Sequence, residues 1–147
     1  MAILISIAGC GQPKASGTSQ TARSQEGASP SKSPGEPVKL FDAEKTYRIE
    51  FSPDPSPIGT SAPFSLHVNV TRASTGEPVG EEASLVVDAA MPEHRHGMNT
   101  QPRVSRVGRG QFDVEGMLLH MPGRWEIYFD VTEGAVTRRA TLQLELE

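Results

Sequence analysis

Apolar and polar residues alternate along the chain from about Lys39 to its end. In residues 45–51, KTYRIEF, the side chains of Tyr47, Ile49 and Phe51 alternate with polar ones. A period of two residues is typical of a strand that buries one face. Similar patterns predict strands in residues 63–72, 84–91, 104–107, 110–116, 124–131 and 136–147.

These segments predict an all-β fold. Pro, Gly and Asp separate them, and none has a clear helical period. Roughly seven short strands with regular turn residues fit an immunoglobulin-like antiparallel β-sandwich. A single cysteine cannot form a disulfide within the chain, so we expect Trp125 and the rows of aliphatic side chains to supply the core.

The residues before the strands have a different composition. From Gly11 to Pro37, alanine is the only apolar residue type, and Gly, Ser, Pro, Gln and charged residues make up most of the rest. Such a segment cannot bury enough surface to offset the entropy of ordering it, so we expect a disordered tether. The sequence thus divides into a signal-like segment (1–10), a disordered linker (11–38) and a sandwich domain (39–147).

Cys10 follows a short apolar stretch, Ile3 to Ala8, and the residues Ile7-Ala8-Gly9 stand directly before it. This arrangement resembles the lipobox of bacterial lipoproteins, in which the cysteine carries the lipid. No Lys or Arg precedes the apolar stretch, as a signal segment would require, so we expect the true start to lie upstream. The resemblance implies lipidation of Cys10, a membrane anchor and a periplasm-facing location in the cell envelope.

Charge and motifs narrow the functions that the domain can have. The net charge is −4, without a basic run, so nucleic acid is not an expected partner. No apolar run approaches the roughly 20 residues of a membrane-spanning helix. No nucleophile elbow, phosphate-binding loop or HExxH motif is present, so we do not expect an enzyme.

Histidine and methionine gather in one part of the chain. Of the four His, three lie between positions 91 and 121, together with every Met except the initiator. In the stretch MPEHRHGM, residues 91–98, His94, His96 and Met98 share one side if the backbone is extended. Gly97 could take a positive φ that folds the third side chain inward. The flanking Pro92 and Pro102 exclude a central strand, so we expect a loop.

A second segment, LHMPG at residues 119–123, could lie at the same end of the sandwich. By parity with the strand before it, His120 would point inward, whereas a bulge at Gly116 would reverse that. Imidazole and thioether ligands without thiolates suit copper, above all Cu(I), better than zinc. The predicted metal ligands are His94, His96, Met98, His120 and Met121, with Met91 and Met117 as possible additions.

Ordinary structural roles account for the same residues equally well. Met91, Met117 and Met121 could simply fill gaps in a small core, and a histidine beside a Pro-Gly turn often bonds to backbone carbonyls. His67, on the polar side of its strand, is expected to be a surface residue. The acidic residues Asp88, Asp113, Glu115 and Asp130 are expected on solvated strand faces.

The two segments together resemble the YtkA-like family of bacterial envelope proteins, which pair an "MP…HGM" stretch with a "G.(Y/F)…MPG.W" stretch. The matching residues are Met91, Pro92, His96, Gly97, Met98, Gly110, Phe112, Met121, Pro122, Gly123 and Trp125. The resemblance implies an immunoglobulin-like sandwich outside the cytoplasm and an association with copper handling.

Two functions follow as hypotheses. The first is a lipid-anchored copper carrier, buffer or sensor that passes the ion to a copper-receiving envelope protein. The second is a non-catalytic structural or protein-interaction domain without metal, in which the His/Met loop closes the sandwich or contacts a partner.

Overall fold

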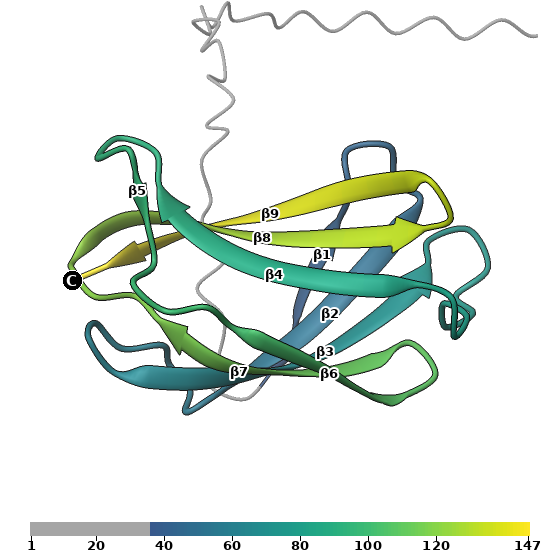
Figure 1. Ribbon diagram of the computed structural model, residues 1–147, viewed down its shortest axis with the longest axis horizontal. Helices are drawn as coiled ribbons and strands as arrows, with labels where there is room; N and C mark the ends of the chain where they lie inside the picture. Colours follow the sequence, from purple (N-terminus) through teal and green to yellow (C-terminus); the bar gives the residue numbers. More distant parts are fainter. Residues whose placement is uncertain (1–35) are drawn as a thin grey trace, which may run out of the picture. The chain divides into compact units, whose positions relative to one another are not determined.

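The structure, a computed structural model, describes residues 36–147. These residues form nine strands and no helix, arranged as two antiparallel sheets that face each other (Figure 1). The predicted all-β sandwich is therefore confirmed. Cys10, the signal-like segment and nearly all of the predicted linker lie outside the described residues. Within 36–147, nothing has the helical length and apolar character that crossing a membrane requires.

Each sheet is open, with two edges. The five-stranded sheet contains, in spatial order, β1 (Val38–Phe41), β2 (Tyr47–Asp54), β3 (Pro63–Arg72), β7 (Gln111–Leu118) and β6 (Arg103–Gly108). The four-stranded sheet contains β5 (His96–Gly97), β4 (Ser84–Met91), β8 (Gly123–Glu133) and β9 (Val136–Leu146).

The core lies between the sheets and follows the alternation of the sequence. In β3, for example, the apolar positions are buried while His67 and Asn69 between them are exposed. Trp125 in β8 is fully buried, as expected for the largest side chain of a sandwich without a disulfide. The apolar rows predicted in the sequence are thus the inward faces of the strands.

Two short strands exceed the seven that the alternation predicts. β1 has four residues and β5 has two, which is too short for a periodic pattern to stand out. β5 pairs only with the end of β4, through Ala90↔Gly97 and Met91↔His96. The expected loop is therefore a tight hairpin whose second strand forms a sheet edge, a position compatible with the prolines on either side.

A bulge interrupts β7 at Gly116, which has a φ of 82°. The register with β3 shifts between Phe64 and Leu66, and Glu115 and Gly116 are both exposed. The bulge moves the buried set from even to odd positions, so that Met117 and Leu119 face the core. The bulge at Gly116, which the sequence left open, is therefore present. As a result His120 does not continue the row of buried side chains that Phe112 and Val114 begin.

At the far end of β8, polar side chains connect the two sheets. The Tyr47 hydroxyl of β2 donates to Glu133 Oε2 of β8 at 2.6 Å. Arg72 of β3 donates from Nη2 to the other carboxylate oxygen at 2.9 Å. One carboxylate thus receives two hydrogen bonds from neighbouring strands of the opposite sheet, which fixes how the layers meet at this end.

Candidate functional site

The β4–β5 hairpin and the β7–β8 connection lie together at the end of the sandwich where the described chain finishes (Figure 1). The ring centroid of His96 is 5.2 Å from that of His120 and 5.9 Å from that of His94. His96 and His120 are 24 positions apart in sequence, and the fold brings them together with His94 into one row of three imidazoles. We call these rings, with Met98 and Met121, the His/Met cluster.

The hairpin presents His96 from a sheet edge. His94 N donates to Met91 O and Arg95 N to Pro92 O, which closes the turn. The positive φ expected at Gly97 is wrong: Arg95 takes it, at 57°. Gly97 instead lies close to β4, where a Cβ would be 3.2 Å from the backbone carbonyl oxygen of Ala89. Glycine at this position therefore allows the two strands to approach closely and is not needed for a turn conformation.

Trp125 lies beneath His96 and His120. Its ring meets theirs edge-on, with centroids 6.0 Å and 5.4 Å apart. Its indole Nε1 donates to Met121 O at 2.9 Å, while Ser61 Oγ donates to His120 O at 3.0 Å. The β7–β8 connection is therefore held from two sides, and the imidazole of His120 starts from a fixed backbone.

The ring nitrogens of His96 and His120 have few partners. His96 Nδ1 lies 3.1 Å from Gly97 O. Since a carbonyl only accepts, this bond requires a proton on Nδ1, and in a neutral imidazole with that proton the lone pair lies on Nε2. His120 Nδ1 is buried and has no hydrogen-bond partner among residues 36–147. An unpaired buried nitrogen costs free energy, so this atom is suited to a ligand.

The methionines divide into two groups. Met98 and Met121 are half-buried and pack against the edge of the core. Met91 and Met117 are almost completely buried within it, where they occupy the positions of gap-filling core side chains. Met98 and Met121 are partly exposed, and they lie close in sequence to His96 and His120. They are therefore better candidates for thioether ligands than the two buried methionines.

Imidazoles and carboxylates alone do not complete a site. In the part of the chain that the structure describes, no group of three or more His, Cys, Asp or Glu side chains could hold a metal ion together. Glu93, the one acid of the hairpin, lies 3.5 Å from Arg124. A metal at this end would therefore need thioether as well as imidazole ligands.

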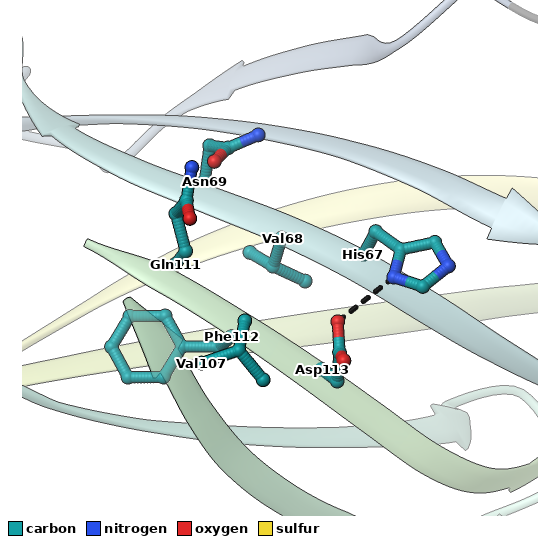
Figure 2. Close-up of a pocket in the computed structure, with 7 residues that line it drawn as sticks. All are labelled: His67, Val68, Asn69, Val107, Gln111, Phe112 and Asp113. Atoms are coloured by element: carbon teal, nitrogen blue, oxygen red, sulfur yellow. Dashed lines mark hydrogen bonds and ion pairs between the residues drawn. The ribbon is translucent and has the colours of Figure 1, made fainter. Parts of the chain in front are cut away.

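Away from the His/Met cluster, a depression lies on the outer face of the five-stranded sheet, over β3, β7 and β6. Figure 2 shows His67 Nδ1 facing Asp113 Oδ1, and the two atoms are 2.8 Å apart. The amides of Asn69 and Gln111 and the apolar Val107 line the depression to one side of this pair. His67 is well exposed, as predicted. The lining contains none of the predicted metal ligands, and a single His–Asp pair offers a metal only two side chains.

Two residues that support the imidazoles were not predicted to do so. Trp125 was expected in the core and as part of the family-like segment, and its contact with His96 depends on the pairing of β5 with β4 and of β4 with β8. Ser61 lies in the loop before β3, and nothing in the pattern of that loop marks it as a support for His120. Its φ of 58° is visible only in the folded chain.

Comparison with known proteins identifies one family. Residues 41–130 match the sequence profile of the family described as YtkA-like. No curated protein matches the sequence. Among solved structures, the chain is similar to a copper-bound variant of FetP from uropathogenic Escherichia coli strain F11, with a TM-score of 0.46 and 8% sequence identity, over 77% of this chain and 95% of that one.

Proposed function

The chain belongs to the YtkA-like family, and we propose that it is a lipid-anchored protein of the cell envelope that binds copper through the His/Met cluster. It would act as a carrier, buffer or sensor rather than as an enzyme. The observation that carries the proposal is the row of three imidazoles, in which the ring centroids of His96 and His120 are 5.2 Å apart. The buried Nδ1 of His120 has no hydrogen-bond partner among residues 36–147.

The types of donor favour Cu(I). Thioethers bind soft monovalent copper well, whereas zinc prefers imidazole combined with thiolate or carboxylate. No three His, Cys, Asp or Glu side chains within residues 36–147 could hold a metal ion together. The ligands proposed to complete the His96–His120 pair are therefore the thioethers of Met98 and Met121, while the exposed His94 lies beside the pair. Copper bound there would be held by ligands from two loops, and it could leave by ligand exchange with a partner protein.

A structural role of the cluster is the alternative. The hydrogen bonds of His96 to Gly97 and of Trp125 to Met121 stabilise the end of the sandwich without any metal. In that case the protein would be a non-catalytic structural or interaction domain. The two functions differ in one measurable property, the affinity for copper.

A competition titration of Cu(I) against a chromophoric chelator tests the proposal. The full chain would carry Cys10→Ser, because its only thiol would otherwise compete for the metal. We expect stoichiometric binding that weakens at least tenfold, about 1.4 kcal/mol, in His96→Ala and in His120→Ala. His67→Ala is the matched control, since the same change is made on the outer face of the other sheet.

Equal affinity in the wild type and in both cluster variants would contradict the copper site and leave the structural role. Equal weakening by His67→Ala would show that the effect is not specific to the cluster. The anchor is tested separately: incorporation of labelled fatty acid in a bacterial host should be lost in Cys10→Ser, and labelling that persists would contradict lipidation at this residue.

A further inference from the structure

The four-stranded sheet ends in a long edge strand, β9. It pairs with β8 over 11 residues, from Val136 to Leu146, without a shift in register. The other edges are shorter or irregular: β1 has four residues, β5 has two, and β6 has six with a register shift. Short length, bulges, prolines and charged side chains are the usual protection of edge strands, and β9 has only the last of these, at Arg138, Arg139 and Glu145.

The β8–β9 hairpin determines which backbone groups of β9 face outward. Its two-residue loop is closed by the pair Glu133↔Val136, and Gly134 has a φ of 59°. The closing pair of such a loop is hydrogen-bonded, so alternate residues of β9 from Val136 onward bond to β8. The remaining residues direct their N–H and C=O groups to the open edge; within β9 they are Thr137, Arg139, Thr141, Gln143 and Glu145.

The charged side chains along this edge of one copy can pair with those of a second copy. Arg139 and Glu145 lie on the outer face of the sheet and are exposed, six positions apart with Leu142 at their midpoint. When two copies of β9 run antiparallel about Leu142, each Arg139 stands opposite Glu145 of the other copy. Arg139 gives Nε and Nη2 to Asp130, which leaves Nη1 for this second carboxylate.

We propose that two copies of this protein associate through β9, in an antiparallel register centred on Leu142, to form one continuous eight-stranded sheet. Four residue pairs of the edge-facing set exchange about eight backbone hydrogen bonds. Opposite charges across the strands stabilise this register, while a parallel alignment would oppose Arg139 to itself. The contact is the same for both copies, as a two-fold interface requires.

Apolar side chains support the same register. Leu142 and Leu144 point toward the sandwich interior but remain only half-buried, because no further strand of the described part, residues 36–147, continues the sheet beyond β9. In the dimer, Leu142 meets Leu142 of the second copy, and Leu144 lies opposite Ala140. β1 lies near β9 but pairs with β2 of the other sheet, and within residues 36–147 no backbone hydrogen bond joins it to β9.

Sedimentation velocity of the full chain tests the proposal, at concentrations up to about 1 mM and in reducing buffer so that Cys10 cannot link copies. We expect a reversible monomer–dimer equilibrium. In Thr141→Pro the dissociation constant should rise at least tenfold, because proline removes an edge-facing donor without removing a bond to β8. Thr137→Pro is the matched control, since it makes the same change outside the paired register.

Charge variants and amide exchange locate the contact. Glu145→Arg should weaken the dimer, whereas Glu147→Arg, with the same change of charge beyond the register, should not. Amide protons of Thr141 and Gln143 should become protected as the concentration rises. A monomer at every concentration, a dimer that Thr141→Pro and Thr137→Pro affect equally, or edge amides already protected in dilute solution would each overturn the proposal. The last result would mean that another segment of the chain covers the edge.

Discussion

Removal of the Tyr47 hydroxyl should destabilise the protein by an amount that depends on pH. In Tyr47→Phe, the hydrogen bond to Glu133 is lost, and with it one of the two donors that reach this carboxylate across the sheets. A hydrogen bond to a charged group contributes about 1.5–3 kcal/mol. We therefore expect the free energy of unfolding at pH 7 to fall by about that amount.

The pH dependence follows from the tyrosine itself. Burial, and then the hydrogen bond to Glu133, raise the pKa of Tyr47 from 10.0 to about 12. Below pH 10 both the folded and the unfolded chain keep the phenol proton, so the stabilisation is fully present. Between about pH 10 and pH 12 the unfolded chain loses its proton first, and about 3 kcal/mol of stability is lost as the pH rises.

Urea unfolding, followed by circular dichroism at pH 7, 9 and 11, measures both effects. The difference between the wild type and Tyr47→Phe should be the same at pH 7 and 9 and should shrink at pH 11, because only the wild type has the raised pKa of Tyr47. Groups that both proteins share contribute equally and cancel in the difference. A difference that stays constant up to pH 11, or that grows, would refute the assignment of the raised pKa to Tyr47. No difference at pH 7 would refute the contribution of the hydrogen bond between Tyr47 and Glu133.

Three further substitutions test the packing. Gly110→Ala should cost at least about 2 kcal/mol of stability, because φ is 67° and a Cβ would lie 2.6 Å from a backbone carbonyl oxygen of β3. The control Gly76→Ala has a φ of 76° but nothing within 4 Å of the new Cβ, so it should cost only about 1–2 kcal/mol. Equal melting temperatures of the two variants would contradict the clash. Met117→Ala should cost about 2–5 kcal/mol in chemical unfolding, as a fully buried side chain does, while a smaller loss would show that the core collapses around it. Asp42→Ala should cost about 1–3 kcal/mol, because the buried carboxylate accepts from the Tyr47 amide; a melting temperature equal to that of the wild type would contradict a role for this bond.

The alternation of residues predicts the sandwich because each strand buries one face, and the burial of β3 and β8 follows that rule position by position. It cannot predict β5, whose two residues are paired only because the turn before them brings them back to β4. Nor could it decide the bulge at Gly116: glycine permits the positive φ, but the shift depends on the register with β3.

The candidate site was predictable in composition and less so in geometry. The clustering of His and Met along the chain pointed to the two segments that the structure brings together, and the three imidazoles lie in one row. The roles of the five predicted ligands and of Met91 and Met117 stay predictions until metal binding is measured. What the sequence could not supply was the support beneath the rings, since the contact of Trp125 with His96 joins two segments that are distant in sequence and meet only through strand pairing.

That contact has a practical consequence. Trp125 is the only tryptophan of the chain, and its ring centroid lies 6.0 Å from that of His96 and 5.4 Å from that of His120. Its ultraviolet emission is therefore a label-free optical signal from a single, known place in the molecule. Any event that alters the charge or the coordination of His96 or His120 should change that emission. The intrinsic fluorescence of the protein therefore reports on the end of the sandwich where a ligand would bind.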